Sequence, residues 1–236
     1  MFITASITTG CHELSTDLEK MNELSNISNN SKVGAACGKT LLPAVAVSVL
    51  FVRKDSIYKE LGVDCWDAER DALKWPGGNP VIAHPPCRAW GQLRQFAKPR
   101  PGEKELAIWS IEQIRKWGGV LEHPRGSTLW PHLNLPVGNN TDEYGGYTIS
   151  VDQFWWGHKA RKRTLLYVCG IERKHLPDIP LRFDAITHYC GFPKSWKGKS
   201  RYGMKEITKS EREATPIDFA KWLIEVANRC GGSHCT

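Results

Sequence analysis

The chain has 236 residues, of which 41% are hydrophobic, enough apolar material for one large domain with a core. Its net charge of +7 favours a polyanionic partner, because proteins that bind phosphates release condensed counterions. The eight cysteines lie at irregular spacings without a C-x-x-C pair, which argues against a disulfide framework or a zinc site and favours the cytoplasm. No apolar run approaches the roughly 18 to 20 residues that span a bilayer, which argues against a membrane protein.

The first half of the chain predicts strands that alternate with helices. Residues 1–42 are rich in Ser, Thr and Asn and predict a flexible N-terminal extension. The apolar run at 45–52 predicts a buried central strand, and a short helix follows at 56–61. A second strand is expected at 63–67 and a third at 81–83, which runs into His84-Pro85-Pro86-Cys87.

The second half continues the pattern. Apolar residues at helical spacing over 103–117 predict a helix that Gly118-Gly119 ends, and further strands are expected from Val120 and at 164–169. We expect an α/β fold with a Rossmann-like, mostly parallel sheet, in which sites lie beyond the carboxyl ends of the strands. The expected domains are an α/β core at 43–170, a small, irregular basic recognition segment at 171–210 and a C-terminal helix closing the core within 211–236.

Cys87 is a candidate nucleophile. It follows two prolines at a strand end, so its backbone is stiff and its thiol is expected to face the crevice. Nearby Arg88 and Arg94 would favour the thiolate, which is the reactive form of cysteine. A structural cysteine in a tight turn remains the alternative.

Glu122 and the segment Arg161-Lys162-Arg163 supply opposite charges at two other strand boundaries. A carboxylate at the end of an apolar strand is costly without a partner or a task, and Glu122 could bind the N3 and amine edge of cytosine. Capping of the loop 124–127 is the structural alternative. Arg161 and Arg163 are expected on one side of the strand and Lys162 on the other, so the two guanidinium groups are the candidate site cations.

The order of these motifs resembles that of the cytosine carbon-5 DNA methyltransferases. Pro86-Cys87 is similar to their Pro-Cys nucleophile, Glu122 to the glutamate of their Glu-Asn-Val strand end, and Arg161-x-Arg163 after Gly157 to their Gln-x-Arg-x-Arg segment. The resemblance implies an enzyme that flips a base out of DNA, adds Cys87 to carbon 6 while Glu122 holds the base edge, and modifies carbon 5. It also suggests a small, divergent, phage-like member.

The resemblance further implies the cofactor and the DNA contacts. S-adenosylmethionine is the expected methyl donor, and no metal is expected. The residues assigned to the cofactor are Phe51, Pro85 and the acidic pair Asp67 and Glu69, of which the pair could instead be surface carboxylates. The residues assigned to the substrate or DNA are Arg88, Arg94, His123, Lys197 and Arg201.

Three alternatives remain open on the sequence. The glycine-free segment 51–56 stands where the family has Phe-x-Gly-x-Gly, so a relative could use another donor, as in phage DNA hypermodification, or act on a nucleotide. His84-Pro85-Pro86-Cys87 loosely resembles the Asp-Pro-Pro-Tyr loop of amino-group methyltransferases. The basic charge and ten tryptophans also fit a non-catalytic DNA-binding or anti-restriction protein on the same scaffold.

Overall fold

The computed structural model describes residues 46–190 and 203–231, so the expected extension at 1–42 lies outside the described residues. A six-stranded mixed sheet is at the centre, with strand order β2-β1-β3-β4-β6-β5. The first four strands in this order are parallel, and β6 runs antiparallel between β4 and β5. The six strands are β1 (Ser48–Leu50), β2 (Asp64–Trp66), β3 (Val81–Ala83), β4 (Gly119–Pro124), β5 (Tyr147–Asp152) and β6 (Arg163–Cys169).

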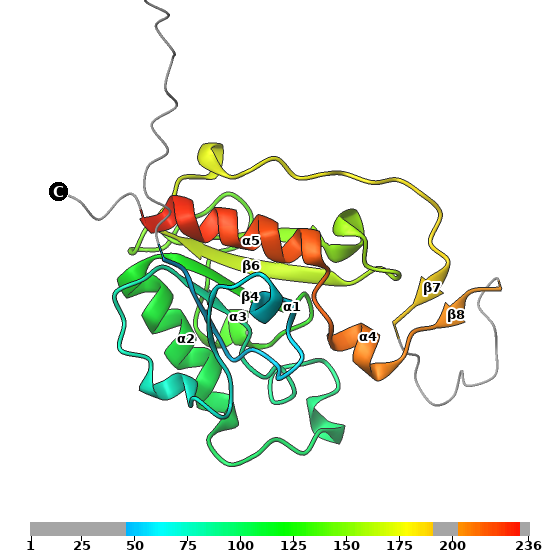
Figure 1. The fold of residues 1–236 in the computed structure, drawn as a ribbon, viewed down its shortest axis with the longest axis horizontal. Helices are drawn as coiled ribbons and strands as arrows, with labels where there is room; N and C mark the ends of the chain where they lie inside the picture. The colour runs from blue at the N-terminus through cyan, green and yellow to red at the C-terminus, as the bar shows by residue number, and fades with distance from the viewer. Residues whose placement is uncertain (1–45, 191–202, 232–236) are drawn as a thin grey trace, which may run out of the picture. The chain divides into compact units, whose positions relative to one another are not determined.

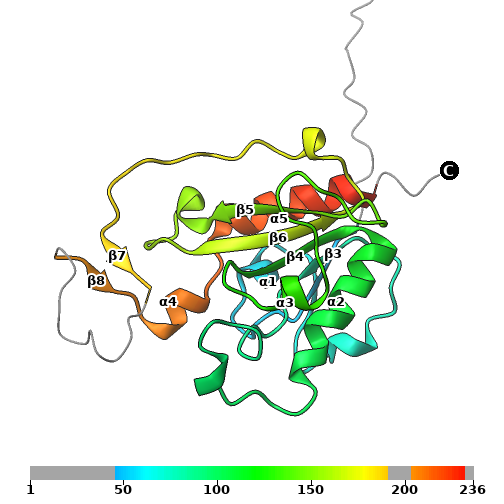
Figure 2. The same ribbon diagram turned by 180° about the vertical axis from the view of Figure 1, so that it is seen from behind.

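Helices cover both faces of this sheet, which makes the fold α/β with a mostly parallel sheet, as the sequence predicted (Figures 1 and 2). The α-helices are α1 (Ile57–Glu60), α2 (Glu103–Trp117), α3 (Leu129–His132), α4 (Lys209–Glu213) and α5 (Ile217–Cys230). Short 3-10 helices are η1 (Ala72–Lys74), η2 (Arg94–Phe96), η3 (Gln153–Trp156) and η4 (Arg173–His175), and a parallel pair is formed by β7 (His188–Tyr189) and β8 (Lys205–Glu206).

Alternation along the strands separates two hydrophobic cores. On β4, Val120 packs with α5 and α1 on one face, whereas Leu121 packs with α2 and α3 on the other. Strand β6 repeats the pattern, because Leu166 belongs to the first core and Tyr167 to the second. Successive side chains on a strand point to opposite faces, so the parity of a residue number decides which core or site it can reach.

Strands β3 and β4 lie unusually close at one point, and glycine makes this approach possible. A Cβ atom on Gly119 would lie 2.0 Å from the Val81 carbonyl oxygen, and Gly119 has a φ of +127°. Glycine tolerates both the close approach and this backbone angle. The Gly118-Gly119 pair therefore ends α2 and brings β4 beside β3, three residues before Glu122.

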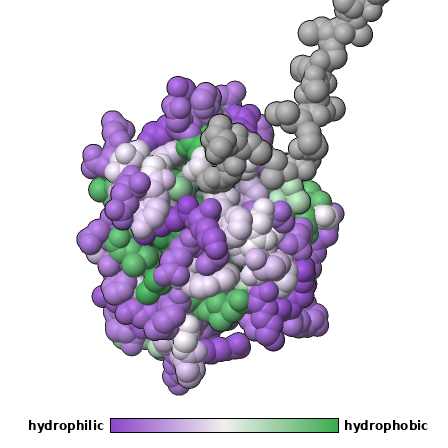
Figure 3. All heavy atoms as spheres, turned by 90° about the vertical axis from the view of Figure 1, so that its left-hand side faces the viewer, coloured by the Kyte–Doolittle hydropathy of each residue, from purple (hydrophilic) through white to green (hydrophobic). Residues whose placement is uncertain are grey.

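The element predictions differ in how well they match. Helix α2 and strand β3 have the predicted bounds, while β1 is shorter than 45–52 because it pairs only over Ser48–Leu50. Strand β5 was not anticipated, and β6 runs antiparallel rather than parallel. No helix in the described ranges is both long and apolar enough to cross a membrane. The face in Figure 3 is mostly hydrophilic, with small separate apolar patches.

Candidate active site

The order of the parallel strands indicates where a site is expected in this sheet. The chain runs from β1 outward to β2 and then crosses back to β3 on the other side of β1. Ligands of open α/β sheets bind at such a switch point, beyond the carboxyl ends of the strands. His84 directly follows β3, and Glu122 lies near the end of the neighbouring strand β4. Because β6 is antiparallel, its first residues, which follow Lys162, lie at this same edge.

Glu122 is a largely buried carboxylate held by two donors. Its side chain is 15% exposed; Oε2 lies 3.1 Å from His84 Nδ1, and Oε1 accepts a 3.1 Å hydrogen bond from Gln153 Nε2. Burial alone would raise the pKa of Glu122, but the His84 hydrogen bond and the positive charge of Lys162 outweigh it and lower the pKa to about 2. Glu122 is therefore an ionised, oriented hydrogen-bond acceptor at neutral pH.

The site cation is Lys162, not the predicted arginine pair. Glu122 pairs with Leu166 across the β4–β6 ladder, so Thr164 and, by the same alternation, Lys162 share the face of Glu122. The Lys162 charge also lowers the pKa of Cys87. The prediction that Lys162 points away from the site is wrong, because the sequence does not reveal which face of β6 meets Glu122.

Arg161 and Arg163 are engaged elsewhere. Arg161 Nη1 donates to Asp152 Oδ2 over 3.3 Å, and its guanidinium lies 5.0 Å from the centre of the Phe154 ring. Arg163 is exposed and, one residue before Thr164, points to the opposite face from Glu122. The expected catalytic role of this arginine pair is therefore not supported by its position.

Cys87 lies in a turn that begins immediately after Pro85-Pro86. The amides of Trp90 and Gly91 donate to the Cys87 carbonyl over 3.0 and 2.8 Å, which fixes the backbone, and the residue is exposed. Desolvation of the thiol and the nearby Glu122 carboxylate raise the pKa of Cys87. This is the opposite of the predicted direction, and the thiol is protonated at neutral pH.

The two arginines expected to activate Cys87 do not act as predicted. Arg88 Nε is paired with the buried Glu103 Oε1 at 2.6 Å, which compensates its charge. Arg94 is exposed and lines a separate groove of about 610 Å³. Neither is among the leading influences on the pKa of Cys87, where the cation that acts is Lys162.

His84 and Tyr58 complete the polar cluster, and the main sequence reading missed both roles. His84 Nε2 lies 3.1 Å from the Tyr58 hydroxyl, and the two ring centroids are 5.3 Å apart. Helix α1 carries Tyr58, which is 1% exposed in the core beneath the site. Tyr58, His84 and Glu122 therefore form a continuous chain of hydrogen bonds. A histidine directly before Pro85-Pro86 was the sequence signal that could have indicated it.

His123 is a core residue rather than a DNA contact. It is fully buried on the face of β4 opposite Glu122, with Nδ1 2.7 Å from Ser127 Oγ and its ring centroid 6.3 Å from that of Trp130. Burial lowers its pKa to about 4, so the ring is neutral near pH 7. The prediction that His123 binds substrate or DNA is wrong because the neighbouring position, not this one, faces the crevice.

The residues expected to hold a cofactor are mostly committed to internal contacts. Asp67 Oδ2 accepts from Lys59 Nζ over 2.6 Å, and Oδ1 accepts from the amides of residues 69 and 70, each over 3.0 Å. The Lys59 hydrogen bond is the main reason that the pKa of Asp67 is lowered to about 2. Glu69 is exposed 3.4 Å from Lys54, and Phe51 packs edge-on against Trp109. Pro85 is buried.

The groove beside the Cys87 turn is lined by cations without acidic partners. Arg94, Arg100 and Lys104 line it together with His132 and one carboxylate, Glu105, but none of the three cations forms an ion pair with a described residue. Such charge is typical of surfaces that attract phosphates. Lys197 and Arg201, the other predicted DNA contacts, lie outside the described residues.

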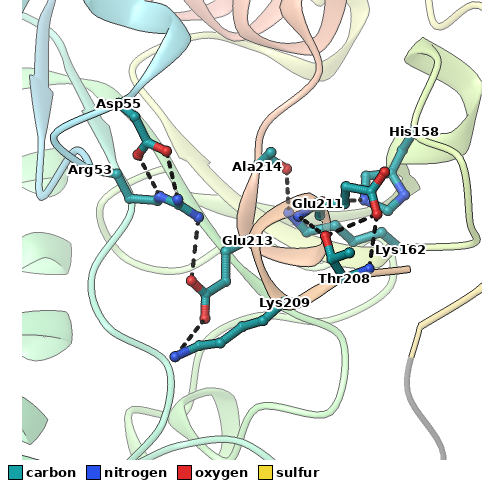
Figure 4. A network of polar contacts seen from close by, with 9 residues as sticks. All are labelled: Arg53, Asp55, His158, Lys162, Thr208, Lys209, Glu211, Glu213 and Ala214. Carbon is teal, nitrogen blue, oxygen red and sulfur yellow. Dashed lines mark hydrogen bonds and ion pairs between the residues drawn. The ribbon is translucent and has the colours of Figure 1, made fainter. Parts of the chain in front are cut away.

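The segment around α4 borders the site and ties two of its elements together (Figure 4). Glu213 pairs with Arg53, which follows β1, at 3.3 Å, and Lys162 Nζ donates to the Ala214 carbonyl over 3.1 Å. Thr208 and Glu211 form a capping box at the start of α4. The α4 segment thus links the end of β1 to the start of β6.

Comparisons with known proteins add no family. Neither the scan of protein-family models nor the search of curated proteins gives a match for this chain. Within the described ranges, no group of three or more His, Cys, Asp or Glu side chains could hold a metal ion. The functional conclusion therefore depends on the geometry around Cys87 and Glu122.

Proposed function

We propose that this chain is an enzyme that modifies carbon 5 of a pyrimidine base in DNA through a covalent adduct of Cys87 with carbon 6. The observation that carries the proposal is the position of the three residues at one edge of the sheet, where Cys87 follows β3, Glu122 lies on the neighbouring β4 and Lys162 directly precedes β6. A thiol, an oriented carboxylate and a cation are the groups that this chemistry requires. The net charge of +7 and the uncompensated cations beside the Cys87 turn support DNA as the substrate.

The sheet topology supports a Rossmann-like, methyltransferase-type scaffold. The parallel strands follow the order β2-β1-β3-β4, with a switch point between β1 and β3. Doubly wound sheets of this order place their sites at that point. Cys87 follows β3, and Glu122 lies near the end of β4, so both residues are next to this switch point.

The proposed chemistry divides among three side chains. Glu122 would accept hydrogen bonds from the N–H groups of the base edge, and Lys162 would stabilise negative charge on an exocyclic carbonyl oxygen of the base. The Cys87 thiol, which is exposed, gives its proton to solvent as sulfur bonds to carbon 6, and the electron pair of the C5–C6 double bond moves toward carbon 5.

The residues that the resemblance assigns to S-adenosylmethionine do not fit it. The loop after β1 has no glycine, and Arg53 is held by Asp55 over 2.9 and 2.8 Å and by Glu213. Asp67, one of the acidic pair assigned to the cofactor, is occupied by Lys59 and two backbone amides. The proposal routes no step through this cofactor, and we favour a different group donor.

A donor-independent experiment tests the reaction class. DNA carrying tritium at carbon 5 of cytosine should release tritium to water, because the adduct lets carbon 5 exchange its hydrogen before sulfur leaves. Cys87→Ser should abolish release, and the matched control Cys65→Ser, a half-buried thiol on β2, should keep it. Release that is unchanged in Cys87→Ser, or no release from cytosine or uracil DNA, would reject the proposal. Salt-dependent DNA binding without release would favour the non-catalytic alternative.

A further inference from the structure

The hydrogen bonds behind Glu122 indicate which ring nitrogen of His84 carries hydrogen. Tyr58, His84 and Glu122 come from α1, the end of β3 and β4, and each link is 3.1 Å long. A histidine ring nitrogen either donates or accepts, depending on whether it carries hydrogen. The partners on either side of His84 therefore decide which of its nitrogens is protonated.

The Glu122 side of the chain requires a donor. Glu122 is ionised, and a carboxylate accepts hydrogen bonds but has no hydrogen to give. Its Oε1 already accepts from Gln153 Nε2, and Oε2 faces His84 Nδ1. Two acceptors facing each other in a largely buried site would repel, so Nδ1 of His84 carries hydrogen.

The Tyr58 side of the chain requires an acceptor. Burial raises the pKa of Tyr58 well above its ordinary value, so the hydroxyl keeps its hydrogen. Among the described residues, this hydroxyl has no hydrogen-bond partner besides His84 Nε2. A buried hydroxyl hydrogen without an acceptor is costly, so Nε2 accepts and carries no hydrogen itself.

We infer that His84 is held as the neutral Nδ1–H tautomer by Tyr58 and acts as a positioning residue that directs one N–H at Glu122 Oε2. With Gln153 on the other oxygen, this fixes the plane of the carboxylate. A neutral donor orients the carboxylate without cancelling its charge, and Lys162 is a cation outside this chain of hydrogen bonds that lowers the pKa of Glu122. The catalytic consequence rests on the proposed function; the tautomer does not.

Nitrogen NMR of the histidine-labelled full chain tests the tautomer directly. At neutral pH, the His84 signals, assigned by their loss in His84→Asn, should show a protonated Nδ1 and an unprotonated Nε2. Tyr58→Phe removes the donor to Nε2 while Glu122 still faces Nδ1, so Nδ1 should stay protonated and Nε2 should gain hydrogen in part of the molecules. A protonated Nε2 in the unsubstituted protein, whether the ring is neutral or doubly protonated, would overturn the inference even if the enzyme is active.

A pair of variants tests the positioning role. An asparagine amide can take the place of Nδ1, whereas a glutamine amide takes the place of Nε2. Tritium release should therefore stay within about threefold in His84→Asn and fall roughly tenfold or more in His84→Gln and His84→Ala, in line with losing one hydrogen bond to a charged group. Equal losses in the Asn and Gln variants, with folding intact by circular dichroism, would contradict the role. If the unsubstituted chain releases no tritium, the proposed function fails and the NMR result still decides the tautomer.

Discussion

Glu122 and His123 are neighbours on β4, yet they face two different environments. Glu122 faces Gln153, His84 and Lys162 at the crevice, and burial is outweighed so that it stays ionised. His123 faces Ser127 and Trp130 in the α2 side core, and burial keeps it neutral. The difference teaches that strand alternation, more than residue type, decides which polar side chains can take part in the chemistry.

The largest expected effect separates these two neighbours. Glu122→Gln removes the charge that would bind the base edge, so tritium release should fall at least about a hundredfold. His123→Asn, which can keep the bond to Ser127, should change release less than about threefold at neutral pH. A larger loss in His123→Asn than in Glu122→Gln would break the comparison.

As pH falls, the free energy of unfolding should decrease first through His123 and only at lower pH through Glu122. The folded-state pKa of His123, about 4, lies below its ordinary value of 6.5, so the unfolded chain takes up a proton first and stability falls as pH drops from 6.5 to 4. The loss at His123 is about 3 kcal/mol. Glu122 contributes in a lower window, because its stabilisation is lost as pH falls from 4.5 toward 2.

Urea unfolding across this range checks the assignment. In His123→Asn, the fall in unfolding free energy between pH 6.5 and pH 4 should be smaller than in the unsubstituted chain. The fall below pH 4.5 should remain, since Glu122 is still present. An unchanged slope between pH 6.5 and pH 4 would mean that His123 is not the buried neutral group.

Two neighbouring cations at the start of β6, Lys162 and Arg163, should give a smaller difference of the same kind. Lys162→Met should lower tritium release about tenfold and raise the pKa of both Glu122 and Cys87, because Lys162 lowers both. Arg163→Met, on the opposite face, should leave release within about twofold. Thiol alkylation rates at rising pH would report the Cys87 shift, and equal losses in the two variants would place both residues in the site.

The smallest effect is expected where α4 borders the site. Glu213→Gln removes the ion pair with Arg53, in which both side chains are more than one-third exposed. Such a pair contributes about 0.5 kcal/mol or less to the unfolding free energy. Release of tritium should stay within about twofold, and a tenfold loss would instead assign α4 a direct part in the chemistry.

Sequence patterns predicted where helices and strands lie better than which side of the sheet each side chain faces. The helical spacing over 103–117 and the apolar run at 81–83 depend on local residues, and both elements have the predicted bounds. The direction of β6 depends on pairing with β4, which local pattern does not encode. That pairing is why Lys162 rather than Arg163 faces Glu122.

The contacts that support Glu122 could not be predicted from the sequence. Cys87 follows β3 and Glu122 lies on the adjacent β4, where the Glu122 carboxylate raises the pKa of Cys87. Tyr58 reaches His84 across 26 positions of sequence, and Gln153 reaches Glu122 across 31, so no spacing rule links them. The loop after β1 stands where the resemblance places a cofactor loop, but its charged side chains pair with one another and with Glu213.

Peptide mapping of a trapped complex tests the central claim most directly. DNA carrying 5-azacytosine has a more electrophilic carbon 6, so attack by Cys87 should leave a covalent protein–DNA complex without any group donor. Mass spectrometry should find the nucleotide on the peptide that contains Cys87, and Cys87→Ser should give no complex. A nucleotide attached to any other residue, or equal trapping in Cys87→Ser, would contradict the account.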